Sequence, residues 1–305
     1  MELTHAIEAS PSWSMHRLRY LWRTTKPTIS LLVVVTAIPT LFMAAGANPG
    51  PKLVLATLFG LFLASASASA WNHALEQDID EKMARTKRRP VASGAVSATA
   101  VFTFAAILGI LSTIILYVFA NPLASLLSLS ANIFYVVIYT QCLKRYTVQN
   151  IVIGGAAGAV GPLVGWAAVT GGLSWEAWAM FAVIFLWTPP HFWALAIKYK
   201  DDYKKASIPM LPSVKGVETT RFQIFFYTLT LLPPVIYLSF FTAAGGIFAF
   251  AALASTGIFI AMAWKLYRSK NDKSAMPVFH YSCLYLFLIF GALTVDQIAK
   301  IWIFA

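Results

Sequence analysis

Nine apolar runs of about 20 residues each divide this chain, and no other feature constrains its fold as strongly. A lipid bilayer has a hydrocarbon core of about 30 Å, which an α-helix crosses in about 20 apolar residues. Each run therefore predicts one membrane-spanning helix. We expect an all-α, polytopic membrane protein with nine transmembrane helices in a bundle, over approximately residues 28–46, 52–71, 98–120, 122–141, 151–171, 175–195, 222–242, 244–264 and 279–302.

The composition excludes an ordinary soluble globule. Hydrophobic residues make up 59% of the 305 residues and charged residues only 11%, whereas soluble domains have about 25% charged residues. The polar gaps are too short for a separate hydrophobic core. Residues 1–305 are therefore predicted to form one integral-membrane domain, in which 1–27 is an N-terminal segment and 72–97 and 196–221 are the long loops.

The basic residues predict how the chain is oriented in the membrane. All but two of the 23 lysines and arginines lie in gaps on one side of the bundle, and the exceptions are Lys52 and Lys300. Loops rich in Lys and Arg stay in the cytoplasm. We therefore expect a cytoplasmic N-terminus, cytoplasmic long loops and a C-terminus outside. The net charge of +11 lies in short gaps rather than in a basic stripe, so no nucleic-acid partner is expected.

Two kinds of small or reactive residue are interpreted structurally. Gly154, Gly158, Gly161 and Gly165 recur at three- and four-residue spacings in the fifth run, a pattern typical of close helix packing rather than direct ligand binding. The two cysteines lie in different runs without metal-ligand spacing, so neither a disulfide framework nor a zinc site is expected.

Half of the twelve acidic residues fall in two places, both in predicted cytoplasmic loops. In the first, Asn72, Glu76 and Asp80 are spaced by four, which on a helix places them on one face, while Asp78 points away. The second contains Asp201 and Asp202. The simpler interpretation is a solvated loop rich in charge. Alignment of carboxylates at a membrane boundary instead favours a functional site.

The residues around the two acidic clusters favour a metal with a polyanion. Mg²⁺ is usually held by one or two carboxylates together with substrate phosphates, and neighbouring Arg and Lys bind phosphate oxygens. No glycine-rich nucleotide loop is present, so a lipid diphosphate is expected. The predicted catalytic residues are Asn72, Glu76, Asp80, Asp201 and Asp202, and the predicted metal ligands are Glu76, Asp80, Asp201 and Asp202.

Several long motifs resemble the UbiA superfamily of intramembrane prenyltransferases, and within it the haem O synthases (protohaem IX farnesyltransferases). The first is NHALEQDIDEKMARTKRRP, from Asn72 to Pro90. The others are QNIVIGGAAGA, from Gln149, GWAAVTG, from Gly165, and WTPPHFWALAIKYKDDYKKASIPMLP, from Trp187 to Pro212. The resemblance extends from Thr25 to the last run.

This resemblance implies a nine-helix bundle with a cytoplasmic mouth, in which Mg²⁺ and basic side chains bind farnesyl diphosphate. The farnesyl group would pass to a vinyl group of protohaem IX with addition of water, giving haem O for haem-copper oxidase assembly. Further implied partners are the lipid bilayer of the cell membrane and, transiently, a haem A synthase or the oxidase assembly. The residues expected to bind the diphosphate are Arg85, Arg88, Arg89, Lys144, Lys198 and Lys200.

Two departures from the superfamily pattern narrow the assignment. Glu76 stands where an aspartate is usual, and Tyr199 and Tyr203 stand at the ends of the second motif, with Asp201 and Asp202 between them. Haem O synthases share the second departure. His191 and Asp78 are candidates for the haem side of the site, although His191 is equally well interpreted as a helix-end histidine bonded to a backbone carbonyl.

Three other functions were weighed against a haem-directed prenyltransferase. A UbiA-type enzyme with a quinone-ring acceptor is the nearest alternative. A transporter is less favoured because its ionisable residues would lie near the membrane midplane. A haem-binding electron carrier would need paired histidines on facing helices, which the apolar runs do not supply.

Overall fold

The computed structural model describes residues 11–304 and confirms the predicted fold class. Within that range the regular structure is helical, and nine segments are long and apolar enough to cross a membrane. The helices are α1 (Pro11–Thr24), α2 (Pro27–Ala45), α3 (Pro51–Leu75), α4 (Gln77–Asp80), α5 (Ala98–Phe119), α6 (Pro122–Ile133), α7 (Asn150–Gly158), α8 (Gly161–Thr170), α9 (Trp175–Lys198), α10 (Lys200–Lys205), α11 (Leu211–Val214), α12 (Val217–Leu229), α13 (Leu232–Phe240), α14 (Gly246–Ser269) and α15 (Ala275–Phe304).

Four of the nine spans are built from two helical pieces, and the last of these joins the 3₁₀-helix Asp272–Ser274 to α15. The fourth continues from α6 into a π-helix over Phe134–Leu143, the fifth combines α7 and α8, and the seventh combines α12 and α13. Pro162 follows the break in the fifth span, and Pro233 and Pro234 follow the break in the seventh. Proline lacks the amide hydrogen that a continuous helix needs, so it favours a new helix start at these points.

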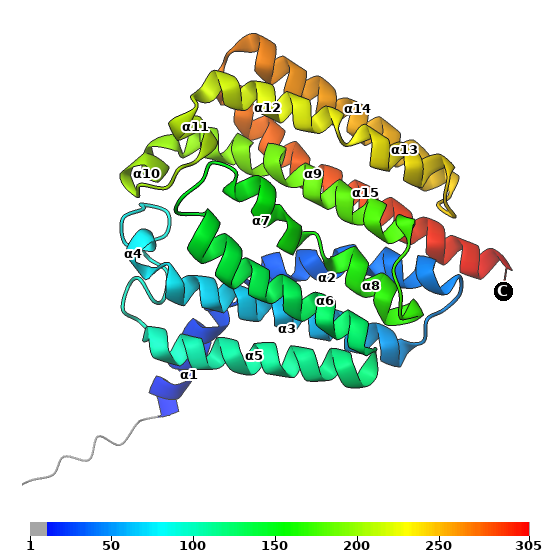
Figure 1. Ribbon diagram of the computed structural model, residues 1–305, viewed down its shortest axis with the longest axis horizontal. Helices are drawn as coiled ribbons and strands as arrows, with labels where there is room; N and C mark the ends of the chain where they lie inside the picture. The colour runs from blue at the N-terminus through cyan, green and yellow to red at the C-terminus, as the bar shows by residue number, and fades with distance from the viewer. Residues whose placement is uncertain (1–10, 305) are drawn as a thin grey trace, which may run out of the picture.

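The long helices lie side by side, and the short connecting helices gather at one end of the bundle (Figure 1). That end carries α1, α4, α10 and α11, whereas the C-terminal end of α15 lies at the opposite end. The loops that hold most of the basic residues therefore share one face, as the charge distribution predicted. This arrangement also places both acidic clusters at the same end of the molecule.

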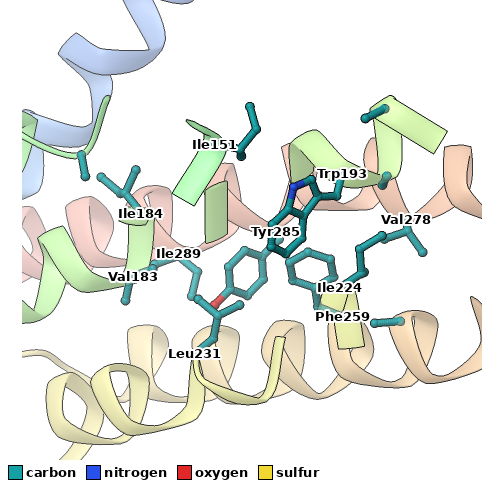
Figure 2. Packing of buried hydrophobic residues seen from close by; sticks show 14 of the residues in the cluster. Ile151, Val183, Ile184, Trp193, Ile224, Leu231, Phe259, Val278, Tyr285 and Ile289 are labelled. Carbon is teal, nitrogen blue, oxygen red and sulfur yellow. The ribbon is translucent and has the colours of Figure 1, made fainter. Parts of the chain in front are cut away.

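Three clusters of buried apolar side chains hold the helices together, and the two larger ones join most of the spans. The larger joins α9 with α12–α15 and includes Trp193, Phe259 and Tyr285 (Figure 2). The smaller joins α2, α3, α5 and α8 and includes Leu41, Leu61 and Leu116. The surrounding lipid tails are as apolar as these side chains, so moving the side chains out of lipid gains no hydrophobic free energy. The contacts stabilise the bundle through close packing instead.

The glycines of the fifth span bring α8 against α2, as predicted for two of the four. A Cβ atom on Gly165 would lie 2.2 Å from Thr40 Oγ1, and one on Gly161 would lie 2.4 Å from Thr36 Oγ1. Gly154 instead makes room for the ring of Tyr139, and Gly158 has open space around it. Packing therefore explains three of the four glycines.

We expect Gly165→Ala to destabilise the bundle by about 1–3 kcal/mol, because the new methyl group must push α8 away from α2. Thermal unfolding in a mild detergent measures the change. Gly257→Ala on α14 is the matched control, since a Cβ there meets no atom within 4 Å. Equal melting temperatures for the two variants would show that the α2–α8 contact yields without cost.

Several helix ends differ from the predicted spans. The second span continues from residue 71 to Leu75, the sixth from 195 to Lys198, and the seventh begins at Val217 instead of 222. Each extension adds polar residues to the end of a helix that lies nearest the short connecting helices, where hydropathy no longer marks the boundary. The first acidic cluster consequently lies at the end of α3 itself.

Candidate active site

The helix that carries Asn72 ends at Leu75, so residues 72–80 do not form one continuous helix. Glu76 has φ −106° and ψ 17°, outside the α-helical values, and the short helix α4 begins at the next residue. The amide of Glu76 still donates to the carbonyl of Asn72, and the amide of Asp80 donates to the carbonyl of Glu76. These bonds preserve the helical spacing across the break.

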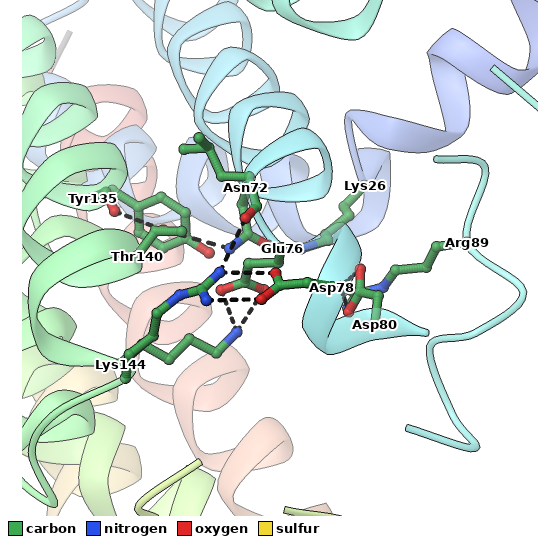
Figure 3. Close-up of polar contacts among 11 residues, drawn as sticks. Lys26, Asn72, Glu76, Asp78, Asp80, Arg89, Tyr135, Thr140 and Lys144 are labelled. Carbon is green, nitrogen blue, oxygen red and sulfur yellow. Dashed lines mark hydrogen bonds and ion pairs between the residues drawn. The ribbon is translucent and has the colours of Figure 1, made fainter. Parts of the chain in front are cut away.

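The predicted orientation of the acidic side chains is nevertheless what the structure shows. Asn72, Glu76 and Asp80 are all buried, with Glu76 at 0% exposure. The side chain of Asp78 is 56% exposed and points outward. The three buried side chains therefore form one interior group at the end of α3, which we call the α3 acidic group (Figure 3).

Glu76 is bound by a lysine from a different span. Lys144 Nζ donates to both carboxylate oxygens of Glu76, at 2.5 and 2.6 Å. Lys144 directly follows the π-helix of the fourth span. Because the carboxylate is fully buried, this charge-assisted pair supplies the compensation that an isolated buried anion lacks. The structure thus places Lys144, an expected diphosphate ligand, beside Glu76.

Asp80 is bound in the same way by Arg89, another expected diphosphate ligand. Arg89 Nη1 lies 2.8 Å from each carboxylate oxygen of Asp80. The loop between them is closed by Thr86, whose hydroxyl donates to the backbone carbonyl of Asp80. Each buried carboxylate of the α3 acidic group therefore has one cationic partner.

Lys26 is a third cation at this site, and it was not among the predicted site residues. Its Nζ donates to Asn72 Oδ1 at 3.1 Å. Burial, together with the nearby positive charge of Arg89, lowers the pKa of Lys26 to about 7. Lys26 also has φ 46°, a left-handed conformation that is uncommon outside glycine and asparagine. A lone lysine before Pro27, at the start of the first span, was the available signal.

Asp78, a candidate for the haem side, lies outside this group and pairs with Arg145. Arg145 Nη1 lies 2.9 Å from Asp78 Oδ2, and Nη2 lies 2.9 Å from Oδ1. The hydrogen bonds from Arg145 lower the pKa of Asp78, and the same contact raises the pKa of Arg145. Arg145 also donates to the carbonyl of Leu75, so the pair fastens the end of α3 to the loop after the fourth span.

We expect Asp78→Asn to change turnover only slightly and to cost less than about 1 kcal/mol in stability, as is typical of exposed ion pairs. Steady-state rates measured at limiting Mg²⁺ would reveal a lost metal ligand as a raised metal requirement. A raised requirement in this variant would show that the site uses both sides of α4.

The second acidic cluster is not brought together with the first. Asp201 is exposed and Asp202 is partly exposed on α10. Among the described residues, no three His, Cys, Asp or Glu side chains lie close enough to hold a metal ion. The predicted set of four ligands therefore does not form one cluster, because α10 turns these carboxylates towards solvent. Tyr203 is the buried residue of α10.

The remaining bases expected at the diphosphate are spread along the same end of the bundle. Arg85 and Lys198 lie on the ring of Tyr199, at 5.8 and 5.5 Å from its centroid. Lys200 lies 3.7 Å from Asp272, before α15, and Arg88 is exposed. Only Lys144 and Arg89 of the six expected bases contact the α3 acidic group in the described part of the chain.

An apolar cavity begins beside the α3 acidic group. It has a volume of about 120 Å³ and lies between α2, α3, the fourth span and α7. Tyr135 lines it and forms an aromatic pair with Tyr139, with ring centroids 5.1 Å apart and ring planes tilted by 35°. Thr140, which contacts Asn72, donates to the carbonyl of Tyr135. Tyr135 thus connects the lining of the cavity to Asn72 through Thr140.

Two histidines lie inside the bundle. His73 is buried beside Asn72, and neither of its ring nitrogens has a hydrogen-bond partner among the described residues. His191 lies within α9 rather than in a turn, and its Nδ1 contacts Ser282 Oγ at 2.7 Å. The alternative interpretation, a helix-end histidine bonded to a backbone carbonyl, is therefore wrong. The contact between His191 and Ser282 could not be predicted from the sequence, because the two residues are 91 positions apart.

Glu76, Asp80 and Asn72 are a chemically suitable set for Mg²⁺. They offer carboxylate and amide oxygens, the donors that this ion prefers. Two carboxylates are enough when substrate phosphates complete the coordination, so a larger cluster of acids is not required. Lys26, Arg89 and Lys144 supply the positive charge that a diphosphate needs in the same place.

Comparison with known proteins places the chain in a family. The profile of the UbiA prenyltransferase family matches residues 33–290. A protoheme IX farnesyltransferase of a Picosynechococcus species is 48% identical over 95% of this chain and 91% of that relative. Its counterpart in Gloeobacter violaceus is 47% identical, over 91% of this chain and 91% of that relative.

Solved structures share the same fold at low identity. A digeranylgeranylglyceryl phosphate synthase aligns with a TM-score of 0.78 and 18% identity, over 93% of this chain and 99% of its own. A UbiA homologue from Archaeoglobus fulgidus, bound to DMAPP and Mg²⁺, aligns with a TM-score of 0.66 and 16% identity, over 90% and 99%. The chain is an integral membrane protein and belongs to the UbiA prenyltransferase family.

Proposed function

We propose that this enzyme transfers a farnesyl group from farnesyl diphosphate to a vinyl group of protohaem IX, giving haem O. The observation that carries the proposal is the α3 acidic group, whose two buried carboxylates are each paired with a cation beside an apolar cavity. The acceptor is assigned from the relatives at 43–48% identity, which are named protoheme IX farnesyltransferases. A quinone-ring acceptor has no comparable support.

The charged end of the site is suited to a diphosphate. Lys144, Arg89 and Lys26 donate to Glu76, Asp80 and Asn72 respectively. When the diphosphate binds, these cations exchange part of their contacts with the acidic group for contacts with phosphate oxygens. Glu76 and Asp80 would then be free to hold Mg²⁺, with Asn72 next to them. When bound, Mg²⁺ neutralises charge on the leaving group.

The aromatic pair is placed to stabilise the carbocation. Loss of diphosphate leaves an allylic cation at the end of the farnesyl chain, next to the charged group. The rings of Tyr135 and Tyr139 present π-electron faces, and such faces attract a cation. The farnesyl chain itself would follow the apolar cavity between α2, α3, the fourth span and α7.

The acceptor step forms one carbon–carbon bond. The terminal vinyl carbon of the haem attacks the allylic cation, which leaves a new positive charge on the vinyl carbon next to the porphyrin ring. Water adds to this carbon and loses a proton, giving a hydroxyethylfarnesyl substituent. The proposal places this step at the cytoplasmic side of the cell membrane, with the N-terminus in the cytoplasm and the C-terminus outside.

For a direct test, the chain is expressed in cells that cannot farnesylate haem themselves. Mass analysis of the extracted haem should then show haem O, and cells carrying the Asp80→Asn variant should contain only protohaem. A prenylated quinone without any modified haem would overturn the assigned acceptor while leaving the prenyltransferase activity in place.

A further inference from the structure

The ring of His191 is held between two aromatic rings inside the bundle. Trp187 covers one face, with centroids 4.3 Å apart and planes at 21°, and Phe279 of α15 covers another, at 4.7 Å and 28°. Both faces of the imidazole are therefore occupied. Its remaining free positions lie in the plane of the ring, where the two nitrogens are.

The contact with Ser282 determines the protonation of one ring nitrogen. The Ser282 hydroxyl donates to the carbonyl of Phe279 at 2.6 Å, and His191 Nδ1 lies 2.7 Å from the same hydroxyl oxygen. A serine has only one proton to donate. The oxygen must therefore accept from His191, so Nδ1 carries the proton and Nε2 has an unprotonated lone pair.

The other nitrogen has no partner in the described part of the chain. His191 is partly exposed, and Nε2 is not one of the fully buried polar atoms that lack a hydrogen bond. The indole of Trp187, which stacks on the imidazole, is itself held by a hydrogen bond from its Nε1 to the carbonyl of Ser282, at 2.8 Å. This bond helps to fix the position of the His191 ring and therefore of Nε2. The fold thus presents an oriented, accessible nitrogen lone pair, which is the form in which histidine binds a metal.

We propose that His191 Nε2 coordinates the iron of the haem acceptor and so positions the porphyrin for farnesyl transfer. The proposal rests on the proposed function, which supplies the haem. Metal-binding histidines commonly donate their second ring N–H to a protein oxygen, which fixes the tautomer and the ring orientation. Ser282 is such an oxygen.

The depth of His191 in the bundle suits a porphyrin with two carboxylates. His191 lies seven residues before Lys198, which corresponds to about 10 Å along the helix axis. An iron held at this level leaves the porphyrin ring in the apolar part of the bundle. Its propionates can then extend towards the basic end, where Lys198 stands.

The test compares haem with metal-free protoporphyrin IX, using the full chain in lipid nanodiscs. The two ligands have the same shape and differ by the iron. Equilibrium titration followed by Soret absorption gives both affinities, and electron paramagnetic resonance of the ferric complex reports a nitrogen ligand. We expect haem to bind at least about tenfold more tightly than the metal-free porphyrin, and Ser282→Ala to reduce this preference without abolishing it.

In His191→Ala we expect the preference for haem to disappear while metal-free porphyrin binds as before. The second result shows that the pocket is still folded. In His191→Gly, added imidazole should restore the wild-type spectrum. The matched control is His280→Ala, since His280 is exposed on the same helix as Ser282. An unchanged haem spectrum and affinity in His191→Ala would overturn the proposal, and His191 would then serve only to pack α9 against α15.

The same experiment separates this proposal from the proposed function. Wild-type farnesyl transfer to haem with an unaltered spectrum in His191→Ala would reject the iron ligand and keep the reaction. The opposite outcome is also distinguishable. If the wild-type protein forms no farnesylated haem but His191→Ala removes the nitrogen signal, His191 is the iron ligand and the proposed reaction is rejected.

Discussion

Asp80→Asn should lower the rate of farnesyl transfer by about 100- to 1000-fold, the loss typical when one preorganised charge-stabilising group is removed from an active site. Asp80 is 2% exposed and bound through both oxygens to Arg89. Asparagine keeps the size of the side chain and removes its charge. The variant therefore loses a carboxylate that we assign to Mg²⁺ and releases Arg89 from its partner.

Rates at saturating farnesyl diphosphate, measured over a range of Mg²⁺ concentrations, test this expectation. Asp78→Asn is the matched control, because it makes the same chemical change two residues away in an exposed ion pair. Equal losses in the two variants, or wild-type rates in Asp80→Asn, would show that the α3 acidic group does not hold the metal. Near-identical circular dichroism spectra would confirm that both variants remain folded.

Lys144→Met should destabilise the protein by about 3–5 kcal/mol, the usual cost of removing one partner from a buried ion pair. Methionine keeps most of the length of the lysine but leaves the carboxylate of Glu76, at 0% exposure, without a cation. Thermal unfolding in the same detergent measures the loss. Activity should fall as well, because Lys144 is also assigned to the diphosphate.

A double variant separates the structural role of this pair from its chemical role. Lys144→Met combined with Glu76→Gln removes both charges, so most of the lost stability should return, while farnesyl transfer should remain absent. If Lys144→Met alone unfolds at the wild-type temperature, the Glu76 carboxylate has another source of compensation and the pair is not the one that holds this end of α3.

The nine spans were predictable because hydropathy alone determines which segments can cross a bilayer. The predicted run 98–120 and the observed span Ala98–Phe119 differ by one residue at the C-terminal end. Boundaries at the end of the bundle that carries the short connecting helices were less predictable. Residues 72–75 continue α3 although the first two are polar, because Asn72 and His73 are buried by neighbouring segments rather than by lipid.

The acidic half of the site was largely predictable, whereas its basic half was predicted only in part, because Arg89 and Lys144 were expected there and Lys26 was not. The spacing of Asn72, Glu76 and Asp80 is local information, and it survives the break at Glu76. Lys144 reaches Glu76 across 68 positions in sequence, and Lys26 reaches Asn72 across 46. Such contacts depend on how the helices pack, which no spacing within one segment encodes.

The second acidic cluster shows the opposite limit. Asp201 and Asp202 were expected at the metal because they are acidic and follow a span, as Glu76 and Asp80 do. The structure instead buries Tyr203 and leaves Asp201 exposed on α10. Charge and position in sequence could not distinguish the two faces of this short helix. The role of Asp201 and Asp202 as metal ligands therefore remains a prediction without geometric support.

The most direct measurement supplies purified protein in nanodiscs with farnesyl diphosphate, reduced protohaem IX, Mg²⁺ and ¹⁸O-labelled water. We predict that the product is heavier than protohaem by one farnesyl group and one water molecule, that it carries the ¹⁸O label, and that one diphosphate is released for each product. Chelation of Mg²⁺ should stop both diphosphate release and product formation. Unmodified haem in the presence of Mg²⁺, or farnesol as the only product, would contradict the account.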